Sequence, residues 1–486
     1  MRTRPAVKPL LALLALASLS AAAACGDDGG ASGFVADTAS AADADTASAA
    51  DTAAADAVAD AASDADAVAD ADADADAAAA DTATVADTAT VADTATASDA
   101  ASDAATDTSK ADTSATADTD TAGPATGCPR ALRPAEGARY FVVSYPYDVD
   151  EALGYGYRVG TLAADGASID IAGERFRLGD RAYFGKIVFT PDGEIGVVAT
   201  DRGKLAVFSL DAAGHPTVVH AALDAGMYAG TLEMAPDGAQ VYVADTEWPN
   251  TGGGIYAVPI GCDGTLGEAR LVLSAKLPNG FRLVPGDPSR GVLMGLELAG
   301  APAGATAHLL DVGATPTARL ASLDVFGDTA FVLGGATFTG DGAYYLAGDI
   351  NELENGDRLA IVPRDGAALG PATVLTVRDP IDVVPSPYGR AAMVVSGYGN
   401  KVVYVHQDAG GAWVADEPPA FVGARPQLPA AAAVVTRGAA KGAVVLAENV
   451  AVRLMRFSPE GGVVDVGAVG TGGGNAGIVG ILGLQP

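Results

Sequence analysis

Six acidic residues recur at similar places in this chain of 486 residues, each at or near the end of a β-branched apolar stretch. They are Asp148, Asp201, Asp245, Glu297, Asp349 and Glu448. Carboxylates gathered on one face would focus negative potential and favour a cation or a basic partner. Asp and Glu are also common turn residues that hydrogen-bond to the nearby backbone. The pattern leaves both interpretations open, a binding face and ordinary turn chemistry.

Two longer segments beside these acids carry further candidates. Residues 246–254 read TEWPNTGGG and include Trp248, one of two Trp in the chain. An aromatic side chain on a polar loop is either a contact anchor for a partner or a residue packed on its own fold. Residues 349–357 read DINELENGD and resemble a calcium loop, but Leu353 stands where an oxygen ligand belongs. The sequence therefore predicts no cofactor and no metal site, with calcium at this segment as the alternative.

The sequence offers little evidence for catalysis. Its four histidines, His215, His220, His308 and His406, are scattered, and no Ser-His-Asp set or pair of metal ligands follows from their spacing. The glycine run 470–474 is not followed by a helical pattern, so it does not predict a phosphate loop. We therefore expect a binding or scaffold protein rather than an enzyme.

A repeated unit positions these residues. Its clearest copies read IVFTPDG (187–193), LEMAPDG (232–238), FTGDG (338–342) and DVVPSPYG (382–389), with weaker copies near Leu283 and Ala432. Each copy is an apolar strand and a tight turn, followed by a β-branched strand and two more strands joined by a hairpin. Gly in these turns supplies the positive φ that tight hairpins need. Four strands in roughly 45–55 residues are typical of a β-propeller blade.

About seven such units fit between residues 134 and 484, so the sequence predicts an all-β, seven-bladed propeller. The first unit begins at the turn 134–137 and the strand 138–144, without an innermost strand before it. The apolar segment 477–484 is left over at the other end. We expect it to supply that missing strand and to close the ring without an open sheet edge. A pair of β-sandwiches is the alternative, but it would not give a constant four-strand period.

The first 127 residues differ sharply in composition. Residues 1–8 are basic, 9–24 are apolar or small, and Cys25 follows; this run is too short to span a membrane and is typical of a secretory signal peptide. Residues 26–127 contain 23 Asp, no Glu and one basic residue, Lys110. Such low hydrophobicity with high charge predicts a disordered, extended tether. The predicted division is a signal peptide at 1–24, a tether at 25–127 and a propeller domain at 128–486.

The segment 22–25 (AAAC) resembles the cleavage site of bacterial lipoprotein precursors, although Ala22 stands where those proteins carry Leu. The resemblance implies an acylated Cys25 that holds the protein on a lipid membrane. Gly26 rather than Asp follows the cysteine, which favours the outer membrane of a Gram-negative bacterium. An ordinary cleaved signal with an incidental cysteine is the alternative. Export from the cytoplasm is expected in both cases.

The repeat resembles the YncE-like and lactonase-like seven-bladed propellers, through the turn in VFTPDG (188–193) and EMAPDG (233–238) and the β-branched strand after it. Such propellers serve in lactone hydrolysis, surface binding and envelope assembly. A likeness of fold does not choose among these roles. We expect a binding module facing an extracytoplasmic protein or glycan, with a lactonase-like hydrolase or an assembly scaffold as the alternatives.

Two cysteines, Cys128 and Cys262, remain beside Cys25. Disulfides persist outside the cytoplasm. Cys262 falls at the hairpin between third and fourth strands and Cys128 just before the first turn of the first blade, which are positions on the same face of a propeller. The pair is predicted either to form a disulfide that fixes the entry of the tether or to remain two thiols. The net charge of -32 argues against nucleic acid as a partner, and a monomer is expected.

Overall fold

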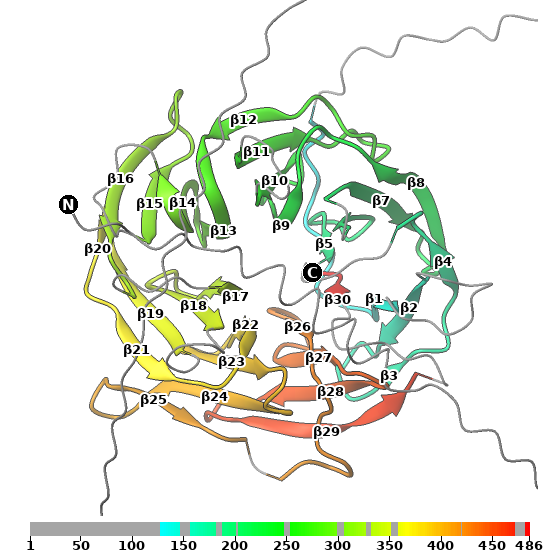
Figure 1. Ribbon diagram of the computed structural model, residues 1–486. Helices are drawn as coiled ribbons and strands as arrows, with labels where there is room; N and C mark the ends of the chain where they lie inside the picture. Colours follow the sequence, from blue (N-terminus) through cyan, green and yellow to red (C-terminus); the bar gives the residue numbers. More distant parts are fainter. Residues whose placement is uncertain are drawn as a thin grey trace, which may run out of the picture. The chain divides into compact units, whose positions relative to one another are not determined.

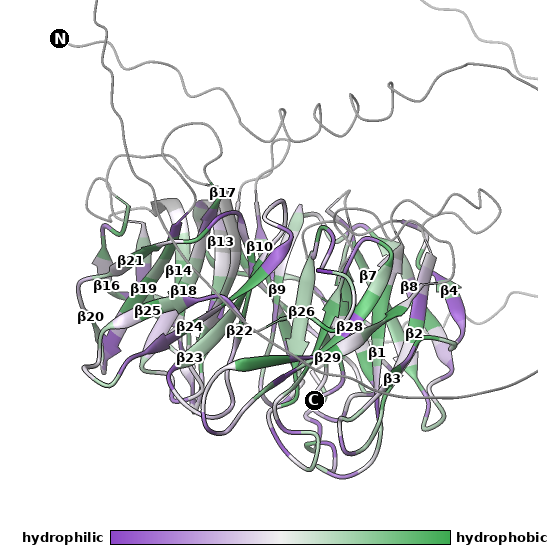
Figure 2. Cartoon of the chain, turned by 90° about the horizontal axis from the view of Figure 1, so that it is seen from below, coloured by the Kyte–Doolittle hydropathy of each residue, from purple (hydrophilic) through white to green (hydrophobic). Residues whose placement is uncertain are grey.

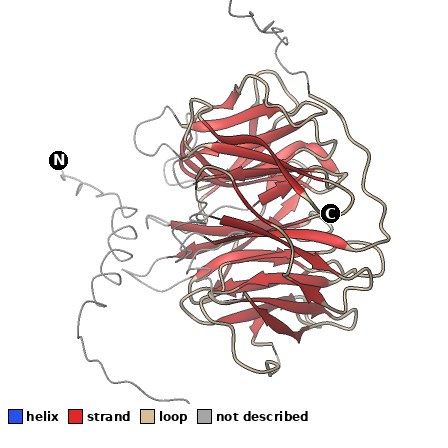
Figure 3. Cartoon of the chain, turned by 90° about the vertical axis from the view of Figure 1, so that its right-hand side faces the viewer, coloured by secondary structure: helices blue, strands red, loops and turns tan. Residues whose placement is uncertain are grey.

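The computed structural model describes residues 127–145, 156–180, 187–200, 203–246, 253–298, 306–326, 332–350, 358–418, 420–471 and 482–486. Every regular element in these ranges is a β-strand (Figure 3), and none of them contains a helix with the length and apolarity to cross a membrane. The strands form seven antiparallel sheets arranged as a ring (Figure 1), which confirms the predicted propeller. The predicted signal peptide, Cys25 and residues 26–126 of the predicted tether lie outside the described residues.

Each sheet is one blade with strands ordered from the centre of the ring outward. The innermost strands of blades one to seven are β30 (Leu482–Leu484), β5 (Ile187–Phe189), β9 (Ala229–Met234), β13 (Ala275–Val284), β17 (Val332–Phe338), β22 (Pro380–Pro385) and β26 (Ala431–Val434). The second strands are β1 (Arg139–Tyr145), β6 (Ile195–Ala199), β10 (Gln240–Asp245), β14 (Asp287–Leu298), β18 (Tyr344–Ile350), β23 (Ala391–Ser396) and β27 (Ala443–Ala447).

The third strand of each blade is still largely buried, whereas the outermost strand is more exposed. The third strands are β2 (Gly156–Leu162), β7 (Leu205–Leu210), β11 (Gly254–Pro259), β15 (Ala307–Asp311), β19 (Arg358–Asp365), β24 (Lys401–Gln407) and β28 (Ala451–Phe457). The outermost strands are β3 (Ile169–Asp170) with β4 (Arg175–Arg177), β8 (Pro216–Leu223), β12 (Arg270–Leu273), β16 (Ala318–Leu323), β20 (Ala368–Leu369) with β21 (Thr373–Thr376), β25 (Trp413–Asp416) and β29 (Val463–Gly470).

The repeated turn motif folds through its own side chains. In blade two, Thr190 Oγ1 donates to Asp192 Oδ1 at 2.6 Å, and the Glu194 N–H donates to the same oxygen at 3.0 Å. Gly193 has φ +76°, a conformation that an L side chain rarely adopts. Thr339 and Asp341 repeat this arrangement in blade five, with a 2.6 Å bond between the same atoms. The motif therefore fixes the reversal between the first and second strands of a blade.

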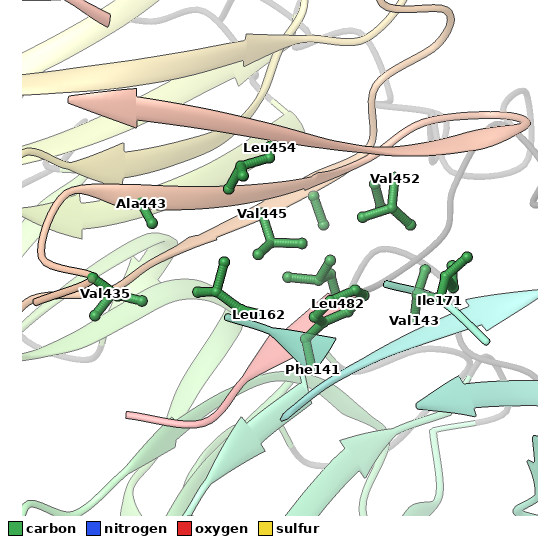
Figure 4. Close-up of a cluster of buried hydrophobic side chains, with 13 residues drawn as sticks. Phe141, Val143, Leu162, Ile171, Val435, Ala443, Val445, Val452, Leu454 and Leu482 are labelled. Atoms are coloured by element: carbon green, nitrogen blue, oxygen red, sulfur yellow. The ribbon is translucent and has the colours of Figure 1, made fainter. Parts of the chain in front are cut away.

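The last strand closes the ring as predicted, although residues 472–481 lie outside the described part. β30 pairs antiparallel with β1, bringing Leu482 opposite Val143 and Leu484 opposite Phe141. Leu482 belongs to a buried cluster that joins blade one to blade seven, in which Phe141 faces Val445 and its neighbours (Figure 4). The first and the last described strands of the propeller thus share one sheet, so no innermost edge is left open in blade one.

The segment 127–138, which we call the strap, crosses three neighbouring blades. Its backbone N–H groups donate from Cys128 to the Ile260 carbonyl at 2.8 Å, from Arg130 to Asp237 at 2.7 Å and from Arg133 to Pro191 at 2.8 Å. Ile260 and Asp237 belong to blade three, and Pro191 belongs to blade two. The strap then enters β1 of blade one (Figure 1). The strap therefore ties blades one, two and three together on one side of the ring.

Candidate functional site

The ring has two unlike faces (Figure 2 shows it edge-on). Because the strands of a blade alternate in direction, its first turn and its outer hairpin meet on one side, which we call the turn face. The loop between second and third strands and the connection to the next blade meet on the opposite side, the loop face. The strap lies on the turn face, whereas the four predicted acids at described positions, Asp245, Glu297, Asp349 and Glu448, belong to the loop face.

The three loop-face acids whose side chains are described are buried. Asp245 and Asp349 are 0% exposed at the ends of β10 and β18, and Glu448, just after β27, is 5% exposed. Glu297 lies in β14 opposite Lys276 of β13, and its side chain is outside the described part. Asp148, Asp201 and Trp248 also lie outside the described residues.

In blade five the buried acid is bound by an arginine. Arg358, the first residue of β19, donates to Asp349 Oδ2 from Nε at 2.9 Å and from a terminal nitrogen at 2.5 Å. The guanidinium also lies over the Phe326 ring, 4.8 Å from its centroid. Phe326 belongs to the connection that enters blade five from blade four. The pair therefore holds a loop-face connection against the blade.

Blade seven carries a more deeply buried version. Arg453 is 2% exposed and donates to Glu448 and, at 2.6 Å, to Asp465 Oδ2. It also donates to the Ala424 carbonyl at 2.7 Å and lies 5.5 Å from the Phe421 ring centroid. These contacts fasten the segment 420–430, which we call the connector, to the loop face.

The three acids of the predicted binding face with described side chains are enclosed by the protein. Asp349 and Glu448 hydrogen-bond to arginines, and Asp245 is enclosed, so these three carboxylates are not presented to solvent. The physical reason is that a carboxylate at a strand end is stabilised by a cation on the neighbouring strand, provided that the pair is fully hydrogen-bonded. Of the two interpretations that the sequence left open, the structural one fits these residues.

The other candidates form no metal-binding group in the described ranges. No group of three His, Cys, Asp or Glu side chains there has the geometry to hold a metal ion. Asp349 is bound to Arg358, and residues 351–357 of the calcium-like segment lie outside the described residues. His308 is buried in β15, its Nδ1 lies 3.0 Å from Ser322 Oγ, and burial followed by the charge of Arg319 lowers its pKa to about 4.

The concave site lies in the central channel. A cavity of about 300 Å³ is lined by residues from the innermost strands of all seven blades, most of them apolar. A second cavity of about 440 Å³ shares Glu233, Arg282, Thr337 and Pro385 with it and extends toward the first turns. Together they form a channel site that opens toward the turn face. Volumes of this size suit a small organic ligand.

One ion pair stands in the described lining of this channel. Arg282 of β13 lies 3.7 Å from Glu233 of β9, and its Nε donates to the Ala336 carbonyl at 2.8 Å. Glu233 in turn accepts from the Leu283 N–H at 3.1 Å. The pair therefore links the innermost strands of blades three, four and five. It also supplies a polar group in an otherwise mainly apolar cavity.

Our sequence reasoning missed this pair. Glu233 sits inside the apolar run LEMA (232–235) and Arg282 next to Leu283, each within an innermost strand. A charge in the strand that lines a propeller's centre is costly unless it is paired. A charged residue within an otherwise apolar innermost strand was therefore the sequence signal that could have indicated this pair. Only the packing of neighbouring blades in the ring, however, brings the two side chains together.

Cys128 and Cys262, the pair for which the sequence left a disulfide open, are joined by a disulfide with 5.1 Å between their Cα atoms. The bond ties the start of the strap to the outer hairpin of blade three. Arg130 supports it by donating to the Cys262 carbonyl at 2.6 Å and to Asp192 Oδ2 at 2.7 Å. The chain thus enters the propeller at a fixed point on the turn face.

Comparisons with known proteins establish the fold and not the activity. No protein-family model and no curated protein matches this sequence. Among solved structures, a protein of Bacteroides uniformis ATCC 8492, provisionally assigned as a 6-phosphogluconolactonase, is similar with a TM-score of 0.51 and 13% identity, covering 71% of this chain and 99% of its own.

Two further structures show weaker likeness. A protein of Bacteroides fragilis NCTC 9343 with the same provisional assignment has a TM-score of 0.47 and 14% identity over 73% of this chain and 100% of its own. A protein of Desulfotomaculum acetoxidans DSM 771 whose function is unknown has a TM-score of 0.47 and 16% identity over 70% and 98%. At these identities the likeness concerns the arrangement of blades, so any role must be argued from the site.

Proposed function

We propose that this protein is an extracytoplasmic binding module: a seven-bladed ring, held on a lipid membrane through acylated Cys25, that binds a small ligand in its central channel. The observation that carries the proposal is the channel site, a pair of joined cavities in which one ion pair and the hydroxyl groups of Thr337, Ser386 and Thr436 stand among apolar side chains. Apolar walls with a few fixed polar groups are the usual make-up of small-molecule sites.

The location of the proposed site differs from our first expectation. An exposed acidic loop face would have favoured a basic protein or a cation, but the described loop acids serve the fold. The channel instead favours a ligand with an apolar body and a polar group able to meet Arg282 or Glu233. The disulfide between Cys128 and Cys262 supports an oxidising compartment, since such bonds persist outside the cytoplasm.

A pair of alanine-to-tryptophan variants tests the channel. Ala433→Trp fills the cavity from β26, whereas Ala468→Trp adds the same ring to the exposed outer strand β29. Each protein would be purified from envelopes of its own host, and the small molecules released on denaturation would be identified by mass spectrometry. We expect a compound released by the wild type and by Ala468→Trp but not by Ala433→Trp. Equal release from all three, or no compound, would contradict the channel site.

The anchor is tested separately. Cells grown with an alkyne-labelled fatty acid should yield a labelled protein in the outer-membrane fraction. Cys25→Ser should abolish both the label and the membrane retention, because two or three acyl chains are what hold such a protein permanently. Retention of the Cys25→Ser protein in the membrane would show another means of attachment. An unlabelled wild type would point to an ordinary cleaved signal.

A lactone hydrolase is the second candidate, favoured by one observation: a carboxylate and a guanidinium meet in a cavity, at Glu233 and Arg282. A carboxylate can act as a general base, and a guanidinium can stabilise a developing oxyanion. Purified protein would be assayed with sugar lactones. Activity that falls by about 100-fold or more in Glu233→Gln would favour the hydrolase. If the wild type does not accelerate lactone hydrolysis, the hydrolase is excluded for these substrates and the binding module stands.

A further inference from the structure

Three arginines meet on the turn face where the strap joins blade one to blade seven. Arg133 lies in the strap, Arg139 begins β1, and Arg437 follows β26. Arg139 donates to the Arg437 carbonyl at 3.3 Å, which brings the two chain segments together from opposite ends of the propeller. A Cβ added at Gly438 would lie 2.2 Å from the Ala135 carbonyl oxygen, so the segments are in close contact. We call these residues the arginine cluster.

Backbone carbonyl groups hold two of the three guanidinium groups. Arg139 donates to the Ala135 carbonyl at 2.9 Å, and Arg133 donates to the Ala138 carbonyl at 2.8 Å. Arg139 is 1% exposed, while Arg133 and Arg437 are half-buried. The cluster is therefore built into the closure of the ring, with its two outer members reaching toward solvent.

Each arginine keeps one buried nitrogen for which the described residues supply no acceptor. These atoms are Arg133 Nη1, Arg139 Nε and Arg437 Nη2. A buried donor without an acceptor costs about 1–3 kcal/mol, and more when it is charged. Three such atoms in one cluster are unusual, because most buried polar groups in proteins are hydrogen-bonded. Three guanidinium groups on neighbouring segments of the turn face therefore each keep a donor that an oxygen acceptor could pair.

The charges in the cluster also point to an anion. Burial and then mutual repulsion lower the pKa of Arg139, through Arg133 and Arg437, but a guanidinium stays protonated. The one nearby acid in the described ranges that offsets this repulsion is Glu136, which is exposed. The chain as a whole carries a net charge of -32, so three clustered arginines are a local exception.

We propose that the arginine cluster is a binding site for a tetrahedral oxyanion of the phosphate class. The planar fork of arginine matches phosphate oxygens, and three such groups can surround one ion. None of the three arginines lines the two channel cavities, although Thr436, next to Arg437, lines the second one. The phosphate is either a small solute or the head group of a membrane lipid, since both present the same oxygens to the turn face.

Binding of the small solute is tested on the full chain in a non-ionic detergent. Inorganic phosphate would be titrated by calorimetry against chloride at equal ionic strength. We expect saturable phosphate binding that weakens about tenfold or more in Arg437→Gln, because one charged hydrogen bond is lost. Arg364→Gln is the matched control: it lies on the same face and donates to the Gly342 carbonyl at 3.1 Å, with no buried unpaired nitrogen among the described atoms.

The folded state of each variant would be checked by circular dichroism, and Arg437 is chosen because it is half-buried and leaves Arg139 in place. Absent phosphate binding by the folded wild type would overturn the proposal, as would equal affinity in Arg437→Gln. Equal weakening in Arg364→Gln would also overturn it, because the effect would then be one of general charge. None of these outcomes depends on a ligand in the channel, so the two proposals fail independently.

A second arm separates the sources of phosphate. The full chain carrying Cys25→Ser, which removes the acylated residue, would be mixed with vesicles of phosphatidylglycerol or of phosphatidylcholine. Sedimentation with phosphatidylglycerol alone, lost in Arg437→Gln and competed by phosphate, assigns the lipid head group. Phosphate binding without sedimentation assigns the small solute. Sedimentation that Arg437→Gln does not change would count against the cluster as the lipid site.

Discussion

Two chain segments are fastened to opposite faces of the ring by different physical means. The strap is held on the turn face by the Cys128–Cys262 disulfide and by backbone hydrogen bonds to blades two and three. The connector is held on the loop face by Arg453, whose guanidinium binds two buried carboxylates and the Ala424 carbonyl. One attachment is covalent, and the other depends on buried charge.

The difference predicts which change weakens each attachment. A disulfide restricts the unfolded chain and responds to reducing agents. A buried ion pair contributes little net stability when intact, but losing one partner leaves uncompensated charge in a low-dielectric site. We therefore expect the loop face to be more sensitive to single substitutions and the turn face to redox conditions and acid.

The largest expected effect is that of Arg453→Met. It leaves Glu448 and Asp465, whose side chains are 4% and 0% exposed, buried without their cation. We expect a loss of about 3–5 kcal/mol in the free energy of unfolding, measured by urea denaturation. Arg358→Met in blade five is the matched comparison, because the Arg358 side chain is 21% exposed and binds one acid. A loss of about 1–2 kcal/mol is expected there. Equal losses of unfolding free energy in the two variants would show that the depth of burial of the arginine does not determine the effect.

Next is the removal of the disulfide by Cys128→Ala and Cys262→Ala together. The two cysteines are 134 residues apart, so their bond closes a long loop in the unfolded chain. We expect the double variant to lose about 2–4 kcal/mol and to become insensitive to dithiothreitol, with the wild type in reductant behaving like the variant. A wild type whose melting temperature ignores reductant would show that the backbone hydrogen bonds alone hold the strap.

A measurement of stability against pH identifies a contribution from His308, which belongs to neither the strap nor the connector. His308 is buried within blade four, and its pKa falls from 6.5 to about 4 in the folded protein. Between these values the unfolded chain binds a proton that the folded chain does not, so stability falls as pH is lowered from 6.5 to 4. We expect a loss of about 2–3 kcal/mol over this range. His308→Gln, measured by urea denaturation at each pH, should flatten the curve. An unchanged slope would place the proton uptake elsewhere.

The smallest expected effect concerns acid and the turn face. Burial raises the pKa of Asp192, but hydrogen bonds from Thr190 and Arg130 outweigh it and leave that pKa below 3.8. The stabilisation is present above this ordinary value and is lost as pH falls through the lower, folded value. Asp192→Asn should therefore flatten the acid limb of the stability curve below about pH 4.

The same change in blade three, Asp237→Asn, is the control for that measurement. Asp237 occupies the equivalent turn and accepts from the Ala239 N–H at 3.0 Å, whereas Asp192 binds Arg130 of the strap. If both variants flatten the acid limb equally, the effect belongs to the turn motif and not to the attachment of the strap.

The sequence alone was sufficient for the architecture. Turns such as TPDG (190–193) and the β-branched strands after them are local signals, because a tight reversal needs Gly and its Asp and Thr bond within four residues. The missing first strand near Pro134 and the spare apolar segment at the end of the chain predicted the closure through β30. Both signals, the four-strand repeat and the missing innermost strand of the first unit, can be found in the sequence without the structure.

Tertiary structure decided what the charged residues do. Whether Asp349 or Glu448 faces solvent depends on an arginine of the next strand and an aromatic from the previous connection, which no local pattern specifies. Glu233 meets Arg282 because neighbouring blades pack with β9 beside β13, and Arg139 meets Arg437 because ring closure places blade one beside blade seven. The partners of a charged residue depend on which distant segments the fold brings close, whereas turns and strands depend on residues that are neighbours in the sequence.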